Sequence, residues 1–415
     1  MPKRNPDMKI LWVKAGGLVP PDTGGKIRSY NILRELGRQH SVTFFSFYAA
    51  HDGDSHPELK HIFDRAICVP LSLPGPKSPR EMLSYGIRLL SSEPYGITKF
   101  CRPQVRRRLR ALLEEETYDV ILCDFVSAAG VIPWDSPTPK VLFTHNVEAM
   151  IWRRHYEVAT NPVWKAVSLL EWRKMEAAEL RYLRLADHVL TVSETDRDAF
   201  SAFLNPAKVT VIPTGVDVDY FQPLPLEESQ NSLVFTGSMD WLPNEDAILY
   251  FVDAVLPMIT QQCPDVSLEV VGRSPSRKLR ALAETEKGIR LTGWVEDIRP
   301  FVARGSICIV PLRIGGGTRL KIFEAMAMSK AVVSTSIGAE GLPVRSGENI
   351  LLADTPKDFA ESVISLLGDA KERRRLGSAA RILVQEKYSW PKVAENFART
   401  LQDVISQPKQ PVSRG

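Results

Sequence analysis

Short apolar segments alternate with longer helical segments through most of this chain, and this alternation restricts the fold more than any other feature. Parallel strands need a long crossover connection, usually a helix, so such a series is typical of open parallel α/β sheets. Because 415 residues are too many for one ordinary core, we expect two domains. The predicted strands are 9–13, 42–47, 66–70, 120–123, 141–144, 188–192 and 209–212, then 232–236, 267–271, 289–291, 307–310 and 331–334.

A stretch with three prolines and few packing residues, 213–231, separates the two strand series. We interpret it as a linker, with an N-terminal domain of residues 1–212 and a second domain of residues 213–387. Residues 388–415 complete the chain, and the amphipathic pattern of 393–405 after a capping Ser389 predicts a closing helix. We expect residues 1–7 and 407–415 to be disordered.

Composition excludes several classes of protein. No segment reaches the roughly 18 apolar residues of a membrane-spanning helix, and we expect a cytoplasmic protein. Five cysteines, at positions 68, 101, 123, 263 and 308, are odd in number and lack metal-ligand spacing. They predict neither a disulfide framework nor a zinc site, and we expect them to be small buried hydrophobic residues.

A glycine-containing loop, residues 16–25, follows the first predicted strand and precedes a helix expected to begin near Lys26. Gly24 and Gly25 would let backbone amides approach a phosphate at the helix N-terminus, with Lys26 and Arg28 adding positive charge. The alternative is a tight strand-to-helix turn that binds no ligand. The spacing is not that of the Gly-x-Gly-x-x-Gly dinucleotide fingerprint, which disfavours a hydride-transfer enzyme.

A second glycine loop, residues 315–317, follows the strand predicted at 307–310 and leads into another helix. Arg319 and Lys321 can supply the charge-assisted hydrogen bonds that a diphosphate requires. Lys321 and Glu324 are three residues apart and lie on neighbouring parts of one helical face, so the carboxylate could accept two ribose hydroxyl protons. The alternative is a surface pair that binds no ligand.

The run at 315–327, Gly-Gly-Gly-Thr-Arg-Leu-Lys-Ile-Phe-Glu-Ala-Met-Ala, resembles the donor-binding region of family 4 glycosyltransferases. Further matches occur in the same order along nearly the whole chain. They are 24–25 (Gly-Gly), 144–146 (Thr-His-Asn), 192–194 (Val-Ser-Glu), 212–217 (Ile-Pro-Thr-Gly-Val-Asp), 235–237 (Phe-Thr-Gly), 271–273 (Val-Gly-Arg) and 293–298 (Gly-Trp-Val-Glu-Asp-Ile).

The resemblance implies a GT-B fold, in which two Rossmann-like domains with parallel sheets face each other across a cleft. It further implies that the second domain holds most of a nucleotide sugar and that the closing helix crosses back to the first domain. Family members are retaining and metal-independent, and we therefore expect no cofactor and no metal. The Asp-x-Asp spacing at Asp217 and Asp219 falls in the predicted linker.

The resemblance assigns roles to individual residues. His145 and Glu324 are the expected catalytic residues: His145, by its imidazole or its backbone carbonyl, would steady the transition state, and Glu324 would hold the ribose. The expected donor-binding residues are Gly24, Gly25, Gly237, Arg273, Val295, Gly316, Gly317, Thr318, Arg319, Lys321 and Glu340. Without the resemblance, His145 is more often structural, Arg273 a surface residue and Val295 part of a core.

Two positions depart from the family pattern. Gly316 stands where relatives commonly have a glutamate near the donor sugar, and the loop after Gly237 lacks the arginine and lysine that hold the diphosphate in many relatives. Sugar contacts would then come from the backbone of 315–318. Our hypothesis is that Arg319 and Lys321 compensate for the missing cations.

The excess of positive over negative charge lies in the first half of the chain. Residues 1–212 contain 29 Lys and Arg against 24 Asp and Glu, whereas the remainder has 24 against 25. Arginines at 102, 106, 107, 108 and 110 accompany apolar residues at helical spacing, which predicts a basic amphipathic helix. It could contact anionic lipid that presents a lipid-linked acceptor, or it could be a solvated face over a core stripe. Without a recognisable nucleic-acid-binding module, we expect no nucleic-acid partner.

The sequence therefore predicts a cytoplasmic enzyme that moves a sugar from a nucleotide-diphosphate sugar to a hydroxyl acceptor, with a peripheral position at the inner face of the membrane left open. Surface polysaccharide or glycolipid synthesis is the expected setting. One alternative is a GT-B sugar-nucleotide epimerase or hydrolase, which would use the donor without an acceptor. Another is a catalytically silent subunit that binds nucleotide sugars, an alternative suggested by Gly316.

Overall fold

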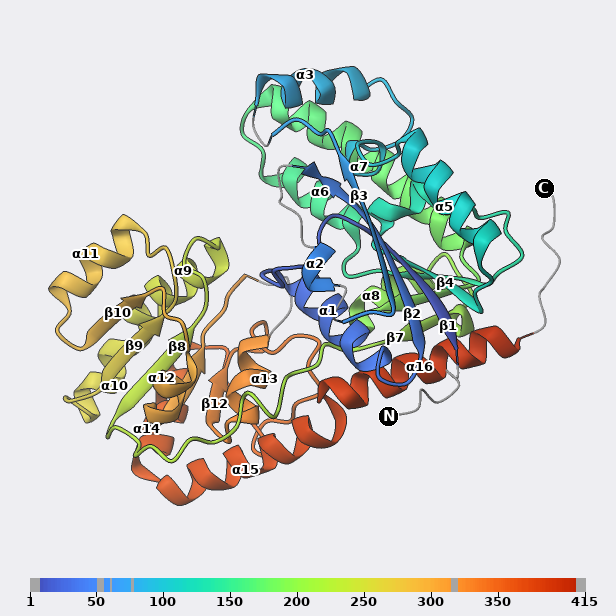
Figure 1. Ribbon diagram of the computed structural model, residues 1–415. Helices are drawn as coiled ribbons and strands as arrows, with labels where there is room; N and C mark the ends of the chain where they lie inside the picture. The colour runs from blue at the N-terminus through green and yellow to red at the C-terminus, as the bar shows by residue number, and fades with distance from the viewer. Residues whose placement is uncertain (1–7, 51–55, 60–61, 76–77, 315–319, 408–415) are drawn as a thin grey trace. The chain divides into compact units, whose positions relative to one another are not determined.

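The computed structural model describes residues 8–50, 56–59, 62–75, 78–314 and 320–407. They divide into two compact units, one containing the residues up to Pro213 together with those from Val393 onward, the other containing Thr214–Lys392. Each unit is built on one parallel sheet with helices packed against it (Figure 1). The predicted α/β class with two parallel sheets is confirmed.

The first sheet has seven strands in the order β3-β2-β1-β4-β5-β6-β7, and all neighbours pair in parallel. Strand order reverses between β1 and β4, and ligands of open α/β sheets bind at such a switch point, beyond the carboxyl ends of the strands. The strands are β1 (Lys9–Ala15), β2 (Ser41–Ala49), β3 (Arg65–Leu71), β4 (Val120–Asp124), β5 (Lys140–Phe143), β6 (His188–Thr191) and β7 (Val209–Val211).

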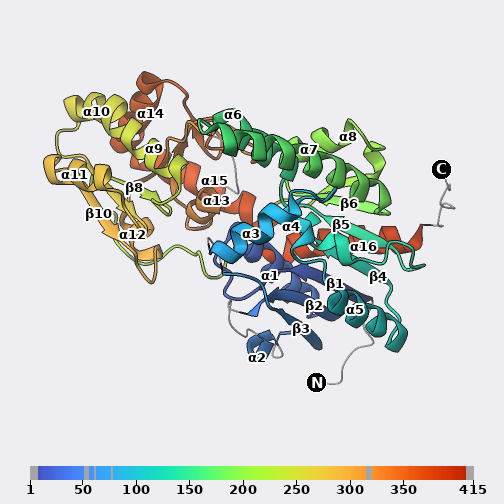
Figure 2. The same cartoon turned by 90° about the horizontal axis from the view of Figure 1, so that it is seen from above.

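Helices cover both faces of this sheet (Figures 1 and 2). Successive strand residues point to opposite faces, so Leu11 and Val13 join the core beneath α5 and α7, whereas Trp12 stacks on Phe397 of α16. The helices of this unit are α1 (Gly24–Leu36), α2 (His56–Leu59), α3 (Pro79–Arg88), α4 (Tyr95–Thr98), α5 (Pro103–Glu115), η2 (Val126–Val131), α6 (Glu148–Val158), α7 (Pro162–Leu185), α8 (Glu194–Ser201), η3 (Pro206–Lys208) and α16 (Trp390–Ser406).

The closing helix α16 belongs to the first unit from Val393 onward. Phe397 is completely buried, and its ring centroid lies 5.5 Å from that of Trp12 and 5.3 Å from that of Phe143. Val393 and Leu401, four residues to either side, are also completely buried, as expected for one apolar stripe of a helix. The predicted return of the closing helix to the first domain is confirmed.

The second sheet has six strands in the order β10-β9-β8-β11-β12-β13, which reverses between β8 and β11. Its strands are β8 (Ser232–Thr236), β9 (Ser267–Val271), β10 (Ile289–Gly293), β11 (Ile307–Val310), β12 (Ala331–Ser334) and β13 (Leu351–Leu352). Its helices are α9 (Leu242–Tyr250), η4 (Phe251–Val255), α10 (Leu256–Gln262), α11 (Arg277–Thr285), α12 (Arg299–Arg304), α13 (Leu320–Ala327), α14 (Pro356–Gly368) and α15 (Ala370–Lys387).

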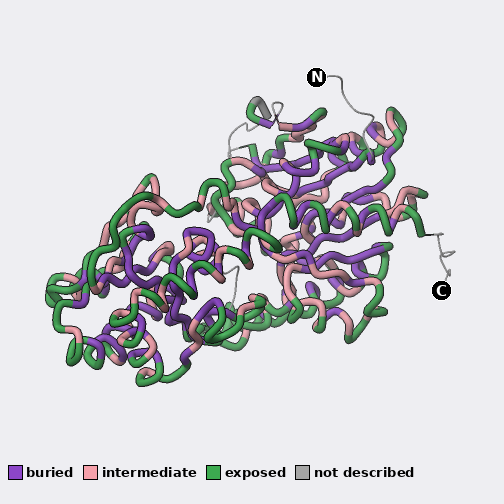
Figure 3. The backbone as a smooth tube through the Cα atoms, turned by 90° about the horizontal axis from the view of Figure 1, so that it is seen from below, coloured by how far each residue is buried: buried purple, intermediate pink, exposed green. Residues whose placement is uncertain are grey.

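All twelve predicted strands are present. Burial is concentrated in the interior of each unit (Figure 3), whereas the edge strands β3 and β10 are largely half-buried. The two-residue strand β13 was not predicted, because it has no length from which to read a pattern. Residues 214–231, which we interpreted as a linker, lie within the second unit, where Val216 is buried and Phe221 and Leu224 pack against the core. The expected disordered ends, apart from Gln407, lie outside the described residues.

The expectations for cysteines and membrane spans can be compared with the structure. None of the five cysteines, all of which lie in the described ranges, forms a disulfide; Cys123 and Cys308 are buried, and the other three are half-buried. Within the described ranges, no helix combines the length and the apolarity needed to cross a membrane. The predicted basic amphipathic helix is α5, whose buried residues are Val105, Leu109 and Leu112.

We predict that Phe397→Ala destabilises the protein by about 3–5 kcal/mol, because it opens a cavity between α16 and the first sheet. Denaturant unfolding measures this loss. Arg399→Ala, on the same helix but with an exposed side chain paired to Glu395, should change stability by less than about 0.5 kcal/mol. Equal effects of the two substitutions would contradict the packing described for α16.

Candidate functional site

Two charged side chains meet at the carboxyl ends of β1 and β4 in the first unit. Lys14 and Asp124 are neighbours in the register of the sheet, and their side chains are only 3% and 0% exposed. Lys14 Nζ lies 2.9 Å from Asp124 Oδ2. Because a buried charge is costly unless it is paired and hydrogen-bonded, each side chain restricts the position of the other.

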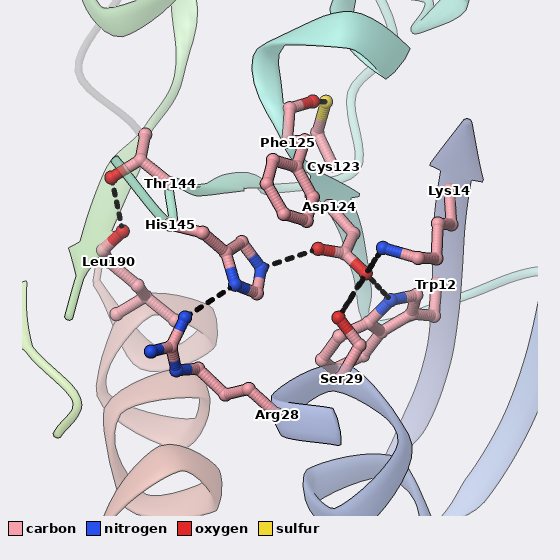
Figure 4. Close-up of polar contacts among 10 residues, drawn as sticks. All are labelled: Trp12, Lys14, Arg28, Ser29, Cys123, Asp124, Phe125, Thr144, His145 and Leu190. Atoms are coloured by element: carbon pink, nitrogen blue, oxygen red, sulfur yellow. Dashed lines mark hydrogen bonds and ion pairs between the residues drawn. The ribbon is translucent and has the colours of Figure 1, made fainter. Parts of the chain in front are cut away.

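The Asp124 carboxylate has three further donors (Figure 4). Oδ2 also accepts from Trp12 Nε1 at 3.0 Å and from Ser29 Oγ at 2.7 Å, and Oδ1 lies 2.8 Å from His145 Nε2. Burial disfavours ionisation, but the charge of Lys14 and the bonds from His145 and Lys14 outweigh it and hold the pKa of Asp124 well below its usual value. The carboxylate is therefore ionised at neutral pH.

His145 is fixed in one tautomer by its two neighbours. Its Nδ1 lies 2.8 Å from Nη1 of buried Arg28, and because a guanidinium can only donate, Nδ1 accepts and Nε2–H donates to Asp124. Burial lowers the pKa of His145 to about 3 and the pKa of Arg28 to about 10. The imidazole is neutral, and both of its nitrogens are already engaged within the protein.

Phe125, the residue after β4, covers this network. Its ring stacks on His145 with centroids 3.8 Å apart and planes 4° apart, and Lys14 Nζ lies 4.5 Å from its centroid. The backbone φ of Phe125 is +69°, which is costly for a bulky residue and common at functional sites. A Cβ on Gly25 would lie 2.5 Å from the Phe125 ring, so this position accepts only glycine without a shift.

A pocket of about 510 Å³ opens at the switch point between β1 and β4. The helix α1 begins at Gly24 and Gly25, and its first turn borders the pocket through Thr23 and Lys26. Arg28, expected to add charge near a phosphate in this loop, instead binds His145. The lining residues are Lys14, Ala15, Gly16, Gly17, Val19, Pro20, Asp22, Thr23, Lys26, Tyr48, Phe125 and Ser127.

A cationic cluster occupies the corresponding switch point of the second unit, between β8 and β11. Lys321 Nζ donates to Asn244 Oδ1 at 2.7 Å and lies 4.0 Å from the centroid of the Phe235 ring. A Cβ on Gly237, where φ is +152°, would come within 2.8 Å of both Asn244 Nδ2 and Lys321 Nζ. Gly237 therefore leaves the space in which the lysine and the amide meet.

Glu324 lies on α13 one turn after Lys321 and is half-buried. Burial raises the pKa of Glu324 to about 7, and the charge of Lys321 opposes that shift without cancelling it. Thr236, at the end of β8, lines a small cavity together with these two residues. The sequence-predicted pair Lys321 and Glu324 is thus adjacent to the ends of β8 and β11.

The remaining predicted residues are less concentrated. Arg273 is exposed, and its Nε donates to Ser238 Oγ at 2.9 Å in the loop after β8. Val295 is half-buried and packs against the core of the second unit. Glu340 is exposed. Gly316, Gly317, Thr318 and Arg319 lie outside the described residues, so the proposed compensation by Arg319 stays a hypothesis.

Sequence reasoning missed Lys14, Asp124 and Asn244. A usable signal existed for the first two, because each is a charged residue that follows a run of apolar residues near the carboxyl end of its strand. Such a residue is costly unless it is paired, which points to a partner on a neighbouring strand. Asn244 gives no such signal, because asparagine near a helix start is ordinary.

Potential metal ligands do not gather in the described part of the chain, where no group of three or more His, Cys, Asp or Glu side chains could hold a metal ion. The carboxylate of Asp217, from the Asp-x-Asp noted in the sequence, accepts the backbone N–H groups of Asp219 and Tyr220 at 3.2 and 3.0 Å. These bonds stabilise a turn.

Two family models match consecutive parts of the chain. The model for "Glycosyltransferase Family 4" matches residues 23–220, and the model for "Glycosyl transferases group 1" matches residues 230–369. Together they include the carboxyl ends of β4 and β5 in the first unit and the Lys321 cluster in the second.

Individual proteins are similar over different lengths. An uncharacterised 44.6 kDa protein from the cps region of Klebsiella pneumoniae is 24% identical over 71% of this chain and 78% of its own length. The phosphatidyl-myo-inositol mannosyltransferase of Mycobacterium tuberculosis is 30% identical over 46% of this chain, and the match spans about half of that protein (53%). The solved structure of Anabaena Alr3699/HepE in complex with UDP has a TM-score of 0.68 at 16% identity and covers 95% of this chain and 100% of its own.

We predict that Asp124→Asn destabilises the protein by about 3–5 kcal/mol, because it leaves the buried Lys14 ammonium without its counter-charge. The matched control is Asp22→Asn: Asp22 Oδ1 pairs with Lys26 Nζ at nearly the same distance, 3.0 Å, but its side chain is 51% exposed. The control should change stability by no more than about 1 kcal/mol. Denaturant unfolding compares the two, and similar losses would contradict the special position of Asp124.

Proposed function

Because this chain belongs to glycosyltransferase family 4 and has the GT-B fold, we propose that it moves a sugar from a nucleotide-diphosphate sugar to a hydroxyl acceptor, with retention and without a metal ion. The observation that carries the proposal is the cluster of Lys321, Asn244 and Gly237 at a strand switch point, with Glu324 one helical turn away. It combines a cation, an amide, an open backbone position and a carboxylate, which are the groups that bind a nucleoside diphosphate.

In the donor complex, Lys321 binds the diphosphate and Glu324 accepts hydroxyl protons of the ribose. Asn244 already holds Lys321 Nζ, so the ammonium loses little freedom when the phosphate binds. In this proposal, Arg273 would supply further hydrogen-bond donors, as would Arg319 and the backbone of 315–318, which lie outside the described residues. Val295 and Glu340 border the base and the sugar. In such a donor site, the positive charge of Lys321, held in position by Asn244, stabilises the nucleoside diphosphate leaving group.

The first unit contributes the pocket beside Gly24 and Gly25, where the first turn of α1 offers backbone amides to negative charge. His145 acts through position: both its nitrogens are engaged, so its backbone carbonyl is the group left to steady the sugar. The Asp124 network keeps that strand end rigid.

The reaction proposed is a same-face substitution. The bond between the sugar C1 and the phosphate oxygen breaks, the bond between C1 and the acceptor oxygen forms, and the departing phosphate takes the acceptor hydroxyl proton. No protein nucleophile is required, and the positive charge of Lys321 stabilises the nucleoside diphosphate as it leaves.

The relative from Mycobacterium tuberculosis carries phosphatidyl-myo-inositol in its name, which favours glycolipid or polysaccharide synthesis and a lipid-linked acceptor. We do not assign membrane contact to α5, because several of its charges are used within the unit. Arg106 donates to the carbonyl of Gly130, Arg108 pairs with Glu115, and Glu115 also pairs with Arg65.

We predict that Lys321→Met weakens nucleoside diphosphate binding by about 10- to 100-fold, the loss expected for charge-assisted hydrogen bonds worth about 1.5–3 kcal/mol. Calorimetric titration with UDP, GDP and ADP measures it. Lys357→Met is the control, because Lys357 is exposed and makes only a loose pair with Glu361 at 3.8 Å. The donor site would be misassigned if the two variants bound equally well, or if no nucleotide bound the wild type.

Donor affinity should rise as pH increases from 6 to 8. The pKa of Glu324 is raised to about 7 in the free protein, and the ionised form accepts both ribose hydroxyls, so binding must release the carboxyl proton at low pH. Glu324→Gln removes this titration but keeps the size of the side chain. The protonation of the phosphate affects both proteins equally, so comparing their binding of the same nucleotide isolates the effect of Glu324. Parallel pH profiles of the two proteins would exclude Glu324 as the ribose ligand.

A further inference from the structure

A second pocket, of about 290 Å³, lies in the first unit beside the one already described. Both pockets are lined by Phe125 and Ser127, so a wall of two residues separates them. This second pocket is bounded by α4, η2, α6 and α7, and it includes Glu148, the first residue of α6. Its lining residues are Gly96, Phe125, Val126, Ser127, Glu148, Ile151, Trp152, His155 and Met175.

The lining combines an aromatic wall with a few polar groups. Trp152, Ile151 and Met175 offer apolar surface, and Glu148, Ser127 and His155 offer hydrogen-bonding atoms. Small-molecule pockets of about 300 Å³ or more have this mixture, and the volume suits a single sugar or a polyol of similar size. An indole face packs against the C–H groups of a sugar ring, while a carboxylate accepts its hydroxyl protons.

The helix start that carries Glu148 is held in place by a second carboxylate. Glu179 of α7 accepts the backbone N–H of Glu148 at 2.8 Å and that of Ala149 at 3.2 Å, which fixes the first turn of α6. Burial raises the pKa of Glu148, and a hydrogen bond from Asn146 opposes that shift. Glu148 also lies three residues after His145, so the pocket is tied to the end of β5.

Apolar side chains are exposed on both sides of this pocket. On the α7 side, Trp164 is 43% exposed, and its ring centroid lies 6.3 Å from that of Trp152. On the α4 side, α3 has no buried residue and packs through Tyr85 against Tyr95, next to Gly96, with ring centroids 4.7 Å apart. Four apolar residues of α3 and the segment just after it are exposed. They are Met82, Leu83, Ile87 and Leu90, which are 71%, 67%, 64% and 92% exposed.

We propose that the second pocket binds the hydroxyl-bearing head of an amphiphilic acceptor, whose hydrocarbon chain leaves the pocket over the exposed apolar residues. Trp152 packs on the head, Glu148 accepts one of its hydroxyl protons, and the head lies against Phe125 and Ser127, which also line the larger pocket. This inference rests on the proposed function, since it identifies the acceptor of the same reaction. A wholly polar acceptor would leave the α3 face without an occupant.

The test uses octyl β-D-glucoside, below its critical micelle concentration, and methyl β-D-glucoside as probes in calorimetric titrations of the full chain. Octyl glucoside should bind at least about tenfold more tightly than methyl glucoside, because its chain removes apolar surface from water. Trp152→Ala should weaken octyl glucoside binding at least tenfold, and Glu148→Gln should weaken both probes by the same factor. The triple variant Leu83→Ser, Ile87→Ser, Leu90→Ser should abolish only the preference for octyl glucoside.

Trp172→Ala is the matched control, because Trp172 is a half-buried tryptophan next to the same core but outside the pocket; it should bind both probes like the wild type. Trp152→Phe keeps an aromatic wall and should retain most of the affinity, which separates loss of the pocket from misfolding. Equal affinity for the two glucosides, or equal losses in Trp152→Ala and Trp172→Ala, would overturn the proposal.

Titrations of the same variants with nucleoside diphosphates distinguish the acceptor site from the proposed function. Unchanged nucleotide binding with no glucoside binding contradicts only the acceptor site, whereas absent nucleotide binding contradicts the proposed function.

Discussion

The buried pair of Lys14 and Asp124 is the interaction on which the site of the first unit depends. Its two charges sit where β1 and β4 end, at the point where strand order reverses. Asp124 fixes the tautomer of His145, His145 gives Phe125 a surface to stack on, and Phe125 fills the space that Gly25 leaves open. Removing the carboxylate would therefore disturb the floor of one pocket and the wall it shares with the other.

The second unit also places a charged side chain at its strand switch point, but Lys321 is only half-buried, whereas Lys14 and Asp124 are buried. The Lys321 ammonium is held over the Phe235 ring by Asn244, and the absence of a side chain at Gly237 leaves room for that contact. Glu324 stays half-buried with a pKa near neutrality, so it can change its protonation state when a ligand arrives. The first unit thus holds a buried, charged framework, and the second holds the groups that would bind the donor in the proposed function.

The fold was readable because a parallel strand buried on both faces leaves a continuous apolar run in the sequence, as residues 120–123 and Ile307–Val310 do. Lys321 and Glu324 were readable because helical spacing places them one turn apart. The partners of His145 were not, because Asp124 and Arg28 come from distant segments that only the sheet order brings together. For the same reason, Arg28 was assigned to a phosphate. It follows Gly24 and Gly25 closely in the sequence, but in the structure it contacts the imidazole of His145. The second pocket was also unpredictable, since its walls come from four separate helical segments.

We propose that this chain, a member of glycosyltransferase family 4, transfers a sugar with retention of configuration and without a metal ion. The most direct measurement incubates the protein with a panel of α-linked nucleotide sugars and octyl β-D-glucoside in the presence of EDTA, followed by NMR of the product's anomeric proton. We expect a new glycosidic bond with the α configuration of the donor, formed equally well with and without the chelator. A β-linked product, a requirement for added metal ion, or a nucleotide sugar that binds without turnover would contradict it.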